Sequence, residues 1–276
     1  MTSMRLGVVS SLEHGPEDIL KKAAKLGFPT VQVTCWNQDC LTPENAEALV
    51  KASERYGVEV TTIWTGTPGD KVWDFLQGPS TIGIVPASRR NAAIRALCKG
   101  ADFAEWTGVP SITTHAGFIP DDPATDAYRS VLGAIKLVAE YCQAKGLEFW
   151  FETGQETPVT LLRVIEDCGT GNLGVNLDPA NLLMYGKANP VDALDVFGQY
   201  VRGVHAKDGE YPTNGRELGV EKPLGEGRVG FPALLKKLDA LGYDGALTIE
   251  REISGPRQVA DIKAGKAFLE GILATL

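Results

Sequence analysis

Short runs of β-branched and apolar residues recur along the whole chain, separated by longer segments of mixed polarity. Such runs predict buried β-strands. The intervening segments have the three- and four-residue spacing of amphipathic helices; between Tyr128 and Cys142, for example, Val131, Ile135 and Val138 share one face. The predicted strands are RLGVVS (5–10), TVQVTCW (30–36), VEVTTIW (58–64), SITTHAG (111–117), EFWFET (148–153), LGVNLD (173–178), VRGVHAKD (201–208) and ALTIERE (246–252).

Glycine and proline mark the predicted helix boundaries. A glycine followed at once by an apolar residue ends a helix, because glycine adopts the left-handed conformation and the next residue folds back on the last turn. Proline at the first helical position starts a helix, because its missing N–H costs nothing there. The ends are Gly27-Phe28, Gly57-Val58, Gly108-Val109, Gly146-Leu147 and Gly242-Tyr243, and the starts are Gly15-Pro16, Thr42-Pro43, Thr157-Pro158 and Asn189-Pro190.

The alternation of strands and helices predicts an α/β fold with a parallel sheet, and eight such units can close into a single (β/α)8 TIM barrel. The 276 residues fit one barrel domain of roughly 250 residues, so we expect residues 1–276 to form one domain. An open doubly wound sheet is the alternative, but no G-x-G-x-x-G turn follows the first strand.

Two connections are long, at about residues 66–87 and 209–229. Both follow predicted strand C-terminal ends, the face on which barrel enzymes build their active sites. We expect these loops to act as lids or substrate walls.

Composition narrows the functional classes. A formal charge of −8 without a long basic run argues against nucleic acid as a partner. Five scattered cysteines without a C-x-x-C pair indicate reduced thiols. The sequence has no signal-peptide pattern and no apolar run long enough to cross a bilayer. We therefore expect a soluble, cytoplasmic protein without a membrane partner, and a homo-oligomer is possible.

Four polar residues follow the apolar parts of the last four barrel strands: Glu152, Asp178, His205 and Glu250. In a barrel these positions point inward at the same end, so their side chains converge. Three carboxylates and an imidazole packed together repel one another unless a cation lies among them. A divalent metal ion at about 2.0–2.3 Å from each ligand resolves this conflict. Taken singly, each acidic residue is better explained as a helix cap or an ion-pair partner, and only the four together favour a metal site.

The ligand set is rich in oxygen, with one nitrogen and no thiolate. It favours manganese, Mn²⁺, with Mg²⁺, Co²⁺ and Zn²⁺ as alternatives.

These residues lie in motifs that resemble the xylose-isomerase-like barrel superfamily, and within it the sugar phosphate isomerase/epimerase family. The resemblance spans nearly the whole chain. The motifs, in order, are FETGQET (151–157), NLDPANLLMYG (176–186), VHAKD (204–208), PLGEG (223–227) and TIERE (248–252).

The resemblance implies a metal-dependent isomerase or epimerase of carbohydrate metabolism. In such enzymes the four residues hold the metal, and the glutamates of strands 5 and 8 also face the substrate from opposite sides. Loss of the α-proton would give an enediolate, which the metal would stabilise. Glu152 and Glu250 would then exchange protons with the substrate as a catalytic acid/base pair.

The sequence departs from the ketose 3-epimerases of this family at two positions. Asn181 stands where they usually carry a histidine, and Tyr211 where they usually carry an arginine. A ketose, a keto-sugar, a cyclitol and a sugar phosphate therefore all stay open as substrates.

Other residues near the predicted strand ends are candidates for substrate binding. They are Trp36, Trp64, His115, Gln155, Asn181, Lys207 and Glu226. The tryptophans can stack on the apolar face of a sugar ring, although core packing explains them equally well. His115 and Lys207 have ordinary alternatives as partners of neighbouring carboxylates, and Asp208 can orient a ligand.

Three other functions compete with this prediction. A metal-dependent lyase or dehydratase, similar to an inosose dehydratase, would use the same proton abstraction. A non-catalytic sugar-binding barrel is possible, but the intact carboxylates argue against it. An endonuclease IV-type repair enzyme needs a histidine-rich zinc cluster, which three histidines cannot supply.

Overall fold

The computed structural model describes residues 4–276, so the first three residues of the predicted domain lie outside the described range. Within this range, eight parallel strands form a closed barrel in the order β1-β10-β7-β6-β5-β4-β3-β2. They are β1 (Arg5–Ser11), β2 (Thr30–Cys35), β3 (Glu59–Thr65), β4 (Ser111–Thr114), β5 (Glu148–Glu152), β6 (Leu173–Leu177), β7 (Val201–Ala206) and β10 (Ala246–Ile249). The predicted (β/α)8 barrel is confirmed.

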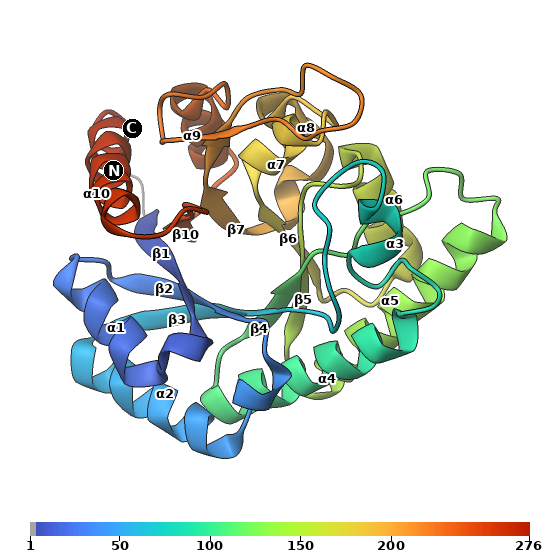
Figure 1. The fold of residues 1–276 in the computed structure, drawn as a ribbon, viewed down its shortest axis with the longest axis horizontal. Coiled ribbons are helices and arrows are strands. Elements are labelled where there is room, and N and C mark those ends of the chain that lie inside the picture. The colour runs from blue at the N-terminus through green and yellow to red at the C-terminus, as the bar shows by residue number, and fades with distance from the viewer. Residues whose placement is uncertain (1–3) are drawn as a thin grey trace.

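Helices surround the strands (Figure 1). The longer ones are α1 (Pro16–Lys25), α2 (Pro43–Tyr56), α4 (Arg90–Thr107), α5 (Asp126–Ala144), α6 (Pro158–Cys168), α8 (Pro190–Phe197), α9 (Phe231–Ala240) and α10 (Pro256–Leu273). Shorter segments are α3 (Gly78–Thr81), α7 (Pro179–Met184), η1 (Leu12–His14), η2 (Gln38–Cys40) and η3 (Gly198–Tyr200).

The helix boundaries follow the predicted chemistry. Thr42 and Thr157 each accept a hydrogen bond from the backbone N–H three residues on, at 3.2 Å, directly before a proline at the first helical position. Gly57 ends α2 with a φ of 62°, in the left-handed region that other residues avoid.

The Trp150 ring fills part of the barrel interior below the mouth. Phe149 and Phe151, its neighbours along β5, point to the opposite face of the sheet and are fully buried there. A Cβ atom on Gly174 of β6 would lie 2.7 Å from the Trp150 ring, so this position has room only for hydrogen. A Cβ atom on Gly203 of β7 would lie 3.3 Å from the same ring and 2.4 Å from Oδ1 of Asn176. The next inward positions on these three strands lie nearer the mouth of the barrel, because strand side chains alternate with a period of two.

The predicted strands extend one to three residues too far at several C-terminal ends. Strand β4 ends before His115, β7 before Lys207, and β10 before Glu250. At these points the chain leaves the sheet. Both long loops also contain short elements, α3 in the first and an antiparallel pair, β8 (Asp208–Gly209) with β9 (Glu221–Lys222), across the second.

The helices of residues 4–276 were searched for membrane spans. None combines the length and the apolar character that a bilayer crossing requires.

Gly100 provides a test of the packing between α4 and β3. A Cβ atom there would lie 2.2 Å from Oγ1 of the fully buried Thr65. We predict that Gly100→Ala lowers the free energy of unfolding by about 1–3 kcal/mol, because the helix or the threonine must move. The matched variant Gly133→Ala, on the open face of α5, has no neighbour within 4 Å of the new methyl group and should stabilise the protein by about 0.5–1 kcal/mol. Urea unfolding measures both, and equal effects would contradict this packing.

Candidate metal centre and active-site cavity

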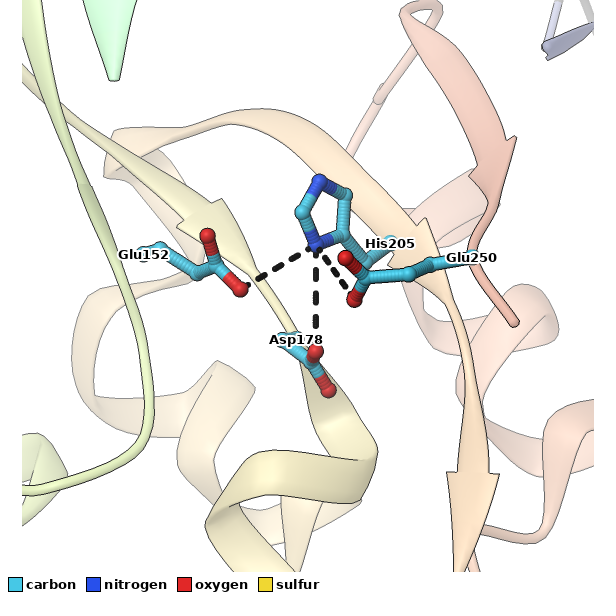
Figure 2. A group of neighbouring side chains, drawn as sticks. All are labelled: Glu152, Asp178, His205 and Glu250. Atoms are coloured by element: carbon cyan, nitrogen blue, oxygen red, sulfur yellow. Dashed lines mark ion pairs between the residues drawn. The ribbon is translucent and has the colours of Figure 1, made fainter. Parts of the chain in front are cut away.

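Four consecutive strands of the barrel bring the predicted metal ligands together. Glu152 is the last residue of β5 and His205 lies in β7, whereas Asp178 and Glu250 directly follow β6 and β10. One ligand atom from each residue lies within 4.8 Å of all the others. The predicted convergence at the C-terminal mouth is therefore present in the structure (Figure 2).

His205 lies at the centre of the cluster. Its Nδ1 atom is 3.3 Å from Oε1 of Glu152, 3.3 Å from Oε2 of Glu250 and 3.7 Å from Oδ2 of Asp178. Figure 2 shows Glu152 and Glu250 approaching this nitrogen from opposite sides, with Asp178 below it. The two glutamates thus face each other across the position that a cation would share with the imidazole.

Local backbone contacts fix Asp178. It is the N-cap of α7, and its Oδ1 accepts the N–H of Asn181 at 2.8 Å. Thr153, next to Glu152, accepts the N–H of Asp178 and donates to its carbonyl, both at 2.8 Å. The cap occupies one carboxylate oxygen and leaves Oδ2 directed at His205.

Donors from three other elements hold Glu152. The indole N–H of Trp64, from β3, donates to Oε2. Nδ2 of Asn181 and Nε2 of His115 each lie 3.3 Å from Oε1. Glu152 is therefore oriented by its surroundings before any ligand binds.

Lys207 is a buried cation behind the cluster. Its Nζ lies 3.1 Å from Oε2 of Glu250, 3.1 Å from Oε2 of Glu252 and 3.6 Å from Oδ2 of Asp178. Only 2% of the side chain is exposed. The lysine holds Glu250 at the edge of the group and offsets part of its negative charge.

The electrostatic environment keeps the carboxylates ionised. Burial alone would raise the pKa of Glu152, but His115 and His205 bring it well below its usual value. Burial also opposes ionisation of Glu250, yet Lys207 and His205 lower its pKa to about 2. The two glutamates in turn raise the pKa of His205 well above its ordinary value, against the effect of its burial. Glu152 and Glu250 thus carry negative charge in the folded protein, which the neighbouring histidines and Lys207 offset in part.

The buried polar atoms of the cluster fit a divalent ion. Oδ2 of Asp178, both ring nitrogens of His205 and Oε2 of Glu250 are buried and make no hydrogen bond within residues 4–276, although Oε2 of Glu250 forms an ion pair with Lys207. Buried polar atoms without partners are costly in a native protein. Three carboxylate oxygens and one imidazole nitrogen are suitable ligands for a hard or borderline ion. Glu152, Asp178, His205 and Glu250 can therefore hold such a metal.

A cavity of about 480 Å³ opens onto this centre. Besides Glu152 and Glu250, four of the residues predicted to bind substrate line it: Trp36, Trp64, His115 and Asn181. Its volume lies in the range typical of small-molecule sites.

Three other residues predicted to bind substrate do not line this cavity. Gln155 is buried, and neither of its amide atoms has a hydrogen-bond partner among the described residues. Lys207 lies behind the carboxylates, and Glu226 is exposed on a turn. Their contact with substrate stays a prediction.

Asp208 explains the glycines of the PLGEG motif. Its carboxylate accepts the backbone N–H groups of Gly209, Gly225, Gly227 and Val229 at 2.9–3.1 Å. A Cβ atom on Gly227 would lie 2.1 Å from Oδ1 of Asp208. The motif therefore wraps the loop around a buried carboxylate, an arrangement that the sequence pattern alone did not reveal.

Several residues of the site were not predicted from the sequence. Trp73, Met184, Tyr185 and Glu252 line the cavity from loops or from the end of α7. Loop positions have no periodicity that predicts their direction, although the aromatic content of the 66–87 segment was an available clue. Glu156 was also missed; it is buried, its Oε2 has no partner in the described chain, and desolvation raises its pKa to about 7.

The chain is similar to known barrel proteins in sequence and in structure. The model of the family described as "Xylose isomerase-like TIM barrel" matches residues 20–272. A crystal structure of a xylose isomerase domain protein from Planctomyces limnophilus is 34% identical, with a TM-score of 0.91 over 98% of this chain and 97% of that one.

Solved structures of lower identity share the fold. A D-tagatose 3-epimerase-like protein is 21% identical, with a TM-score of 0.76 over 99% of this chain and 98% of that one. The 3-keto-D-glucoside 4-epimerase of E. coli is 17% identical, with a TM-score of 0.72 over 97% and 99% of the two chains. At these identities the likeness establishes the architecture.

Metal binding to the cluster should stabilise the fold. At a free Mn²⁺ concentration about one hundred times the Kd, binding adds about 2.7 kcal/mol to the free energy of unfolding. We predict that Mn²⁺ raises the Tm of the native protein and that His205→Ala loses most of this gain. His14→Ala, an exposed histidine outside the cluster, should retain it. An equal rise of Tm in the His205→Ala protein, measured by differential scanning calorimetry, would place the ion elsewhere.

Burial of Glu156 predicts a specific pH dependence. Below about pH 4.5 the carboxyl group is neutral in the folded and unfolded states, so it costs nothing. As the pH rises from about 4.5 to about 7, the unfolded chain ionises while the folded protein keeps the proton, so the stability contributed by this group falls. Above about pH 7 both states are ionised and the loss is complete. We predict that Glu156→Gln gains about 1–3 kcal/mol relative to the native protein between pH 5 and pH 8.

Urea unfolding of both proteins at the two pH values measures this gain. A difference that does not change with pH would show that the carboxylate is solvated or paired.

Proposed function

We propose a function for this chain from the premise that it belongs to the xylose isomerase-like TIM barrel family. It is a divalent-metal-dependent epimerase or isomerase that moves a proton next to the carbonyl group of a sugar-like substrate. Cyclic and open-chain keto-sugars both fit this chemistry.

One observation carries the proposal most directly. Glu152 and Glu250 reach the same imidazole nitrogen at 3.3 Å from opposite sides, and both line one open cavity. A carbon atom held between them has a carboxylate on each face. Epimerisation needs that arrangement, because one group removes a proton from one face and the other returns a proton to the opposite face.

The chain's own residues would bind and position the substrate. Glu152 is held by Trp64, His115 and Asn181, so its direction is set. Lys207 holds Glu250 from behind and keeps it ionised, ready to accept a proton. When bound by the four-residue cluster, a divalent ion would supply electrostatic stabilisation of the negative charge that develops on the substrate oxygen.

The solved structures support a substrate related to sugars. The 3-epimerase-like protein and the keto-glucoside 4-epimerase share the fold over nearly the full length of this chain. A reaction at the carbon beside a carbonyl group would suit the pair of carboxylates found here.

Hydrogen exchange tests the proposal. The Mn²⁺-loaded protein is incubated in D₂O with D-fructose, D-fructose 6-phosphate, scyllo-inosose and 3-keto-D-glucose, and each sugar is analysed by NMR and mass spectrometry. We predict deuterium at the carbon beside the carbonyl of at least one sugar, with inversion of configuration there if the enzyme is an epimerase. Loss of water instead of exchange would indicate a dehydratase, and no exchange into any sugar contradicts the proposal.

The two glutamates should each be essential. Glu152→Gln and Glu250→Gln should lower the exchange rate by at least about 10²-fold, because each removes one proton-transfer group while preserving side-chain volume. Glu140→Gln, on the exposed face of α5, is the matched control and should be unaffected. Near-native exchange by either glutamine variant would show that the corresponding carboxylate transfers no proton.

A further inference from the structure

The mouth of the cavity carries two half-exposed tryptophans. Trp36 follows β2 and is 42% exposed, and Trp73, from the loop after β3, is 41% exposed. Single exposed aromatic residues are common on protein surfaces. Here, however, both line the same cavity as Glu152 and Glu250.

Packing fixes the Trp36 ring. A Cβ atom on Gly66 would lie 2.6 Å from the Cε3 atom of this ring, so the indole lies directly against backbone. The Trp36 ring also packs against Trp64, and the two ring centroids are 4.6 Å apart. Gln38 ties the same region together by donating to the carbonyl of Gly66 at 2.8 Å. The exposed part of the indole is thus held in a defined orientation.

A carboxylate from another loop fixes the backbone of Trp36. Oε1 of Glu13, after β1, accepts the N–H groups of Trp36 at 2.8 Å and Asn37 at 2.7 Å. The side chain of Ser11 donates to the same carboxyl group. Three segments therefore cooperate to place one tryptophan at the rim.

The loop that carries Trp73 is also braced. The ammonium group of Lys71 donates to the carbonyl groups of Thr67, Pro68 and Gly69 at 2.7–3.1 Å. Arg89 donates to the carbonyl of Asp70 at 2.7 Å. Trp73 then lies edge-on to Trp36, with ring centroids 6.3 Å apart, and 5.3 Å from the His115 ring.

The aromatic rings form a series that leads away from the reacting centre. Trp64 is the inner member, because its N–H donates to Glu152. Trp36 packs against Trp64 with the two rings tilted by 48°, and Trp73 lies beside Trp36. Trp36 and Trp73 line the same cavity as the carboxylates and are 42% and 41% exposed, so parts of both indoles are accessible to a ligand that extends outward from the carboxylates.

We propose that Trp36 and Trp73 form an outer subsite for a second ring, so that the substrate is a glycoside whose keto-sugar unit lies at the carboxylates. The C–H bonds on one face of a pyranose ring pack well against an indole, and rigid aromatic anchors give large contact area at small entropic cost. The inference rests on the proposed function for the location of the reacting ring only.

Paired binding measurements test this subsite. The affinities of the Mn²⁺-loaded protein are measured by isothermal titration calorimetry for D-fructose against maltulose and isomaltulose, and for 3-keto-D-glucose against 3-ketocellobiose. These glycosides keep the carbonyl group and the adjacent carbon of the parent sugar unblocked. We expect a glycoside to bind about tenfold more tightly than its parent in at least one pair.

Substitutions of the two tryptophans test whether they cause the preference for glycosides. Trp36→Ala should remove most of the tenfold preference, because it should lower the affinity for the glycoside by a larger factor than the affinity for the parent sugar, and Trp36→Phe should retain most of the preference. Trp73→Ala provides a second, independent variant. Trp106→Ala, which removes an indole that is 46% exposed on α4 and does not line the cavity, is the matched control and should keep the preference.

Two results would overturn the subsite. One is equal binding, or no binding, of both members of every pair by the native protein. The other is an equal loss of parent and glycoside affinity in both Trp36→Ala and Trp73→Ala, which would mean a structural role.

The failure of the subsite is distinguishable from failure of the proposed reaction. Deuterium exchange into D-fructose without any preference for its glycosides would keep the reaction and remove the subsite. A glycoside preference that depends on Trp36, without exchange into any sugar, would keep the subsite and remove the reaction.

Discussion

Repulsion between carboxylates is the constraint that organises the site, because the parallel strands bring them to one end of the barrel. Since the sheet is closed, inward-pointing side chains at the strand ends meet at the same mouth. Glu152, Asp178 and Glu250 consequently meet in a largely buried region beside the cavity, where unpaired negative charge is costly. His205 and Lys207 offset part of that charge, and carboxylate oxygens without a hydrogen bond remain for a divalent ion. The same cost that makes the cluster unfavourable alone makes it a selective site for a cation.

The surroundings of the cluster divide into supports behind it and an aromatic wall in front. Lys207 and the cap formed by Asp178 hold the carboxylates from the barrel side, and Asp208 organises the neighbouring loop through four backbone N–H groups. On the cavity side, Trp64 reaches Glu152 and begins a run of indoles to the rim. Rigid supports on one side and a pre-formed apolar surface on the other suit the proposed proton transfer, because a substrate can be oriented without reorganising the protein.

Much of the fold was predictable because its determinants are local. Strand composition and helix-ending glycines such as Gly57 specify the order of elements, and that order with parallel pairing brings Glu152, Asp178, His205 and Glu250 to one mouth. Other features depend on contacts between distant segments. Glu13 holds Trp36 from another loop, and the space that Trp150 occupies depends on Gly174 of the next strand. The burial of Glu156, which lies only four residues beyond Glu152, has no pattern in sequence, since neighbouring polar residues in a loop face different directions.

We propose that the side chains of Glu152, Asp178, His205 and Glu250 share one ion. A crystal structure of the protein soaked with Mn²⁺, with diffraction data collected at the manganese absorption edge, would locate that ion. We expect one strong anomalous peak at about 2.0–2.3 Å from a carboxylate oxygen of Glu152, Asp178 and Glu250 and from Nδ1 of His205. A cluster without an anomalous peak at saturating Mn²⁺, or a peak bound only by other residues, would contradict it.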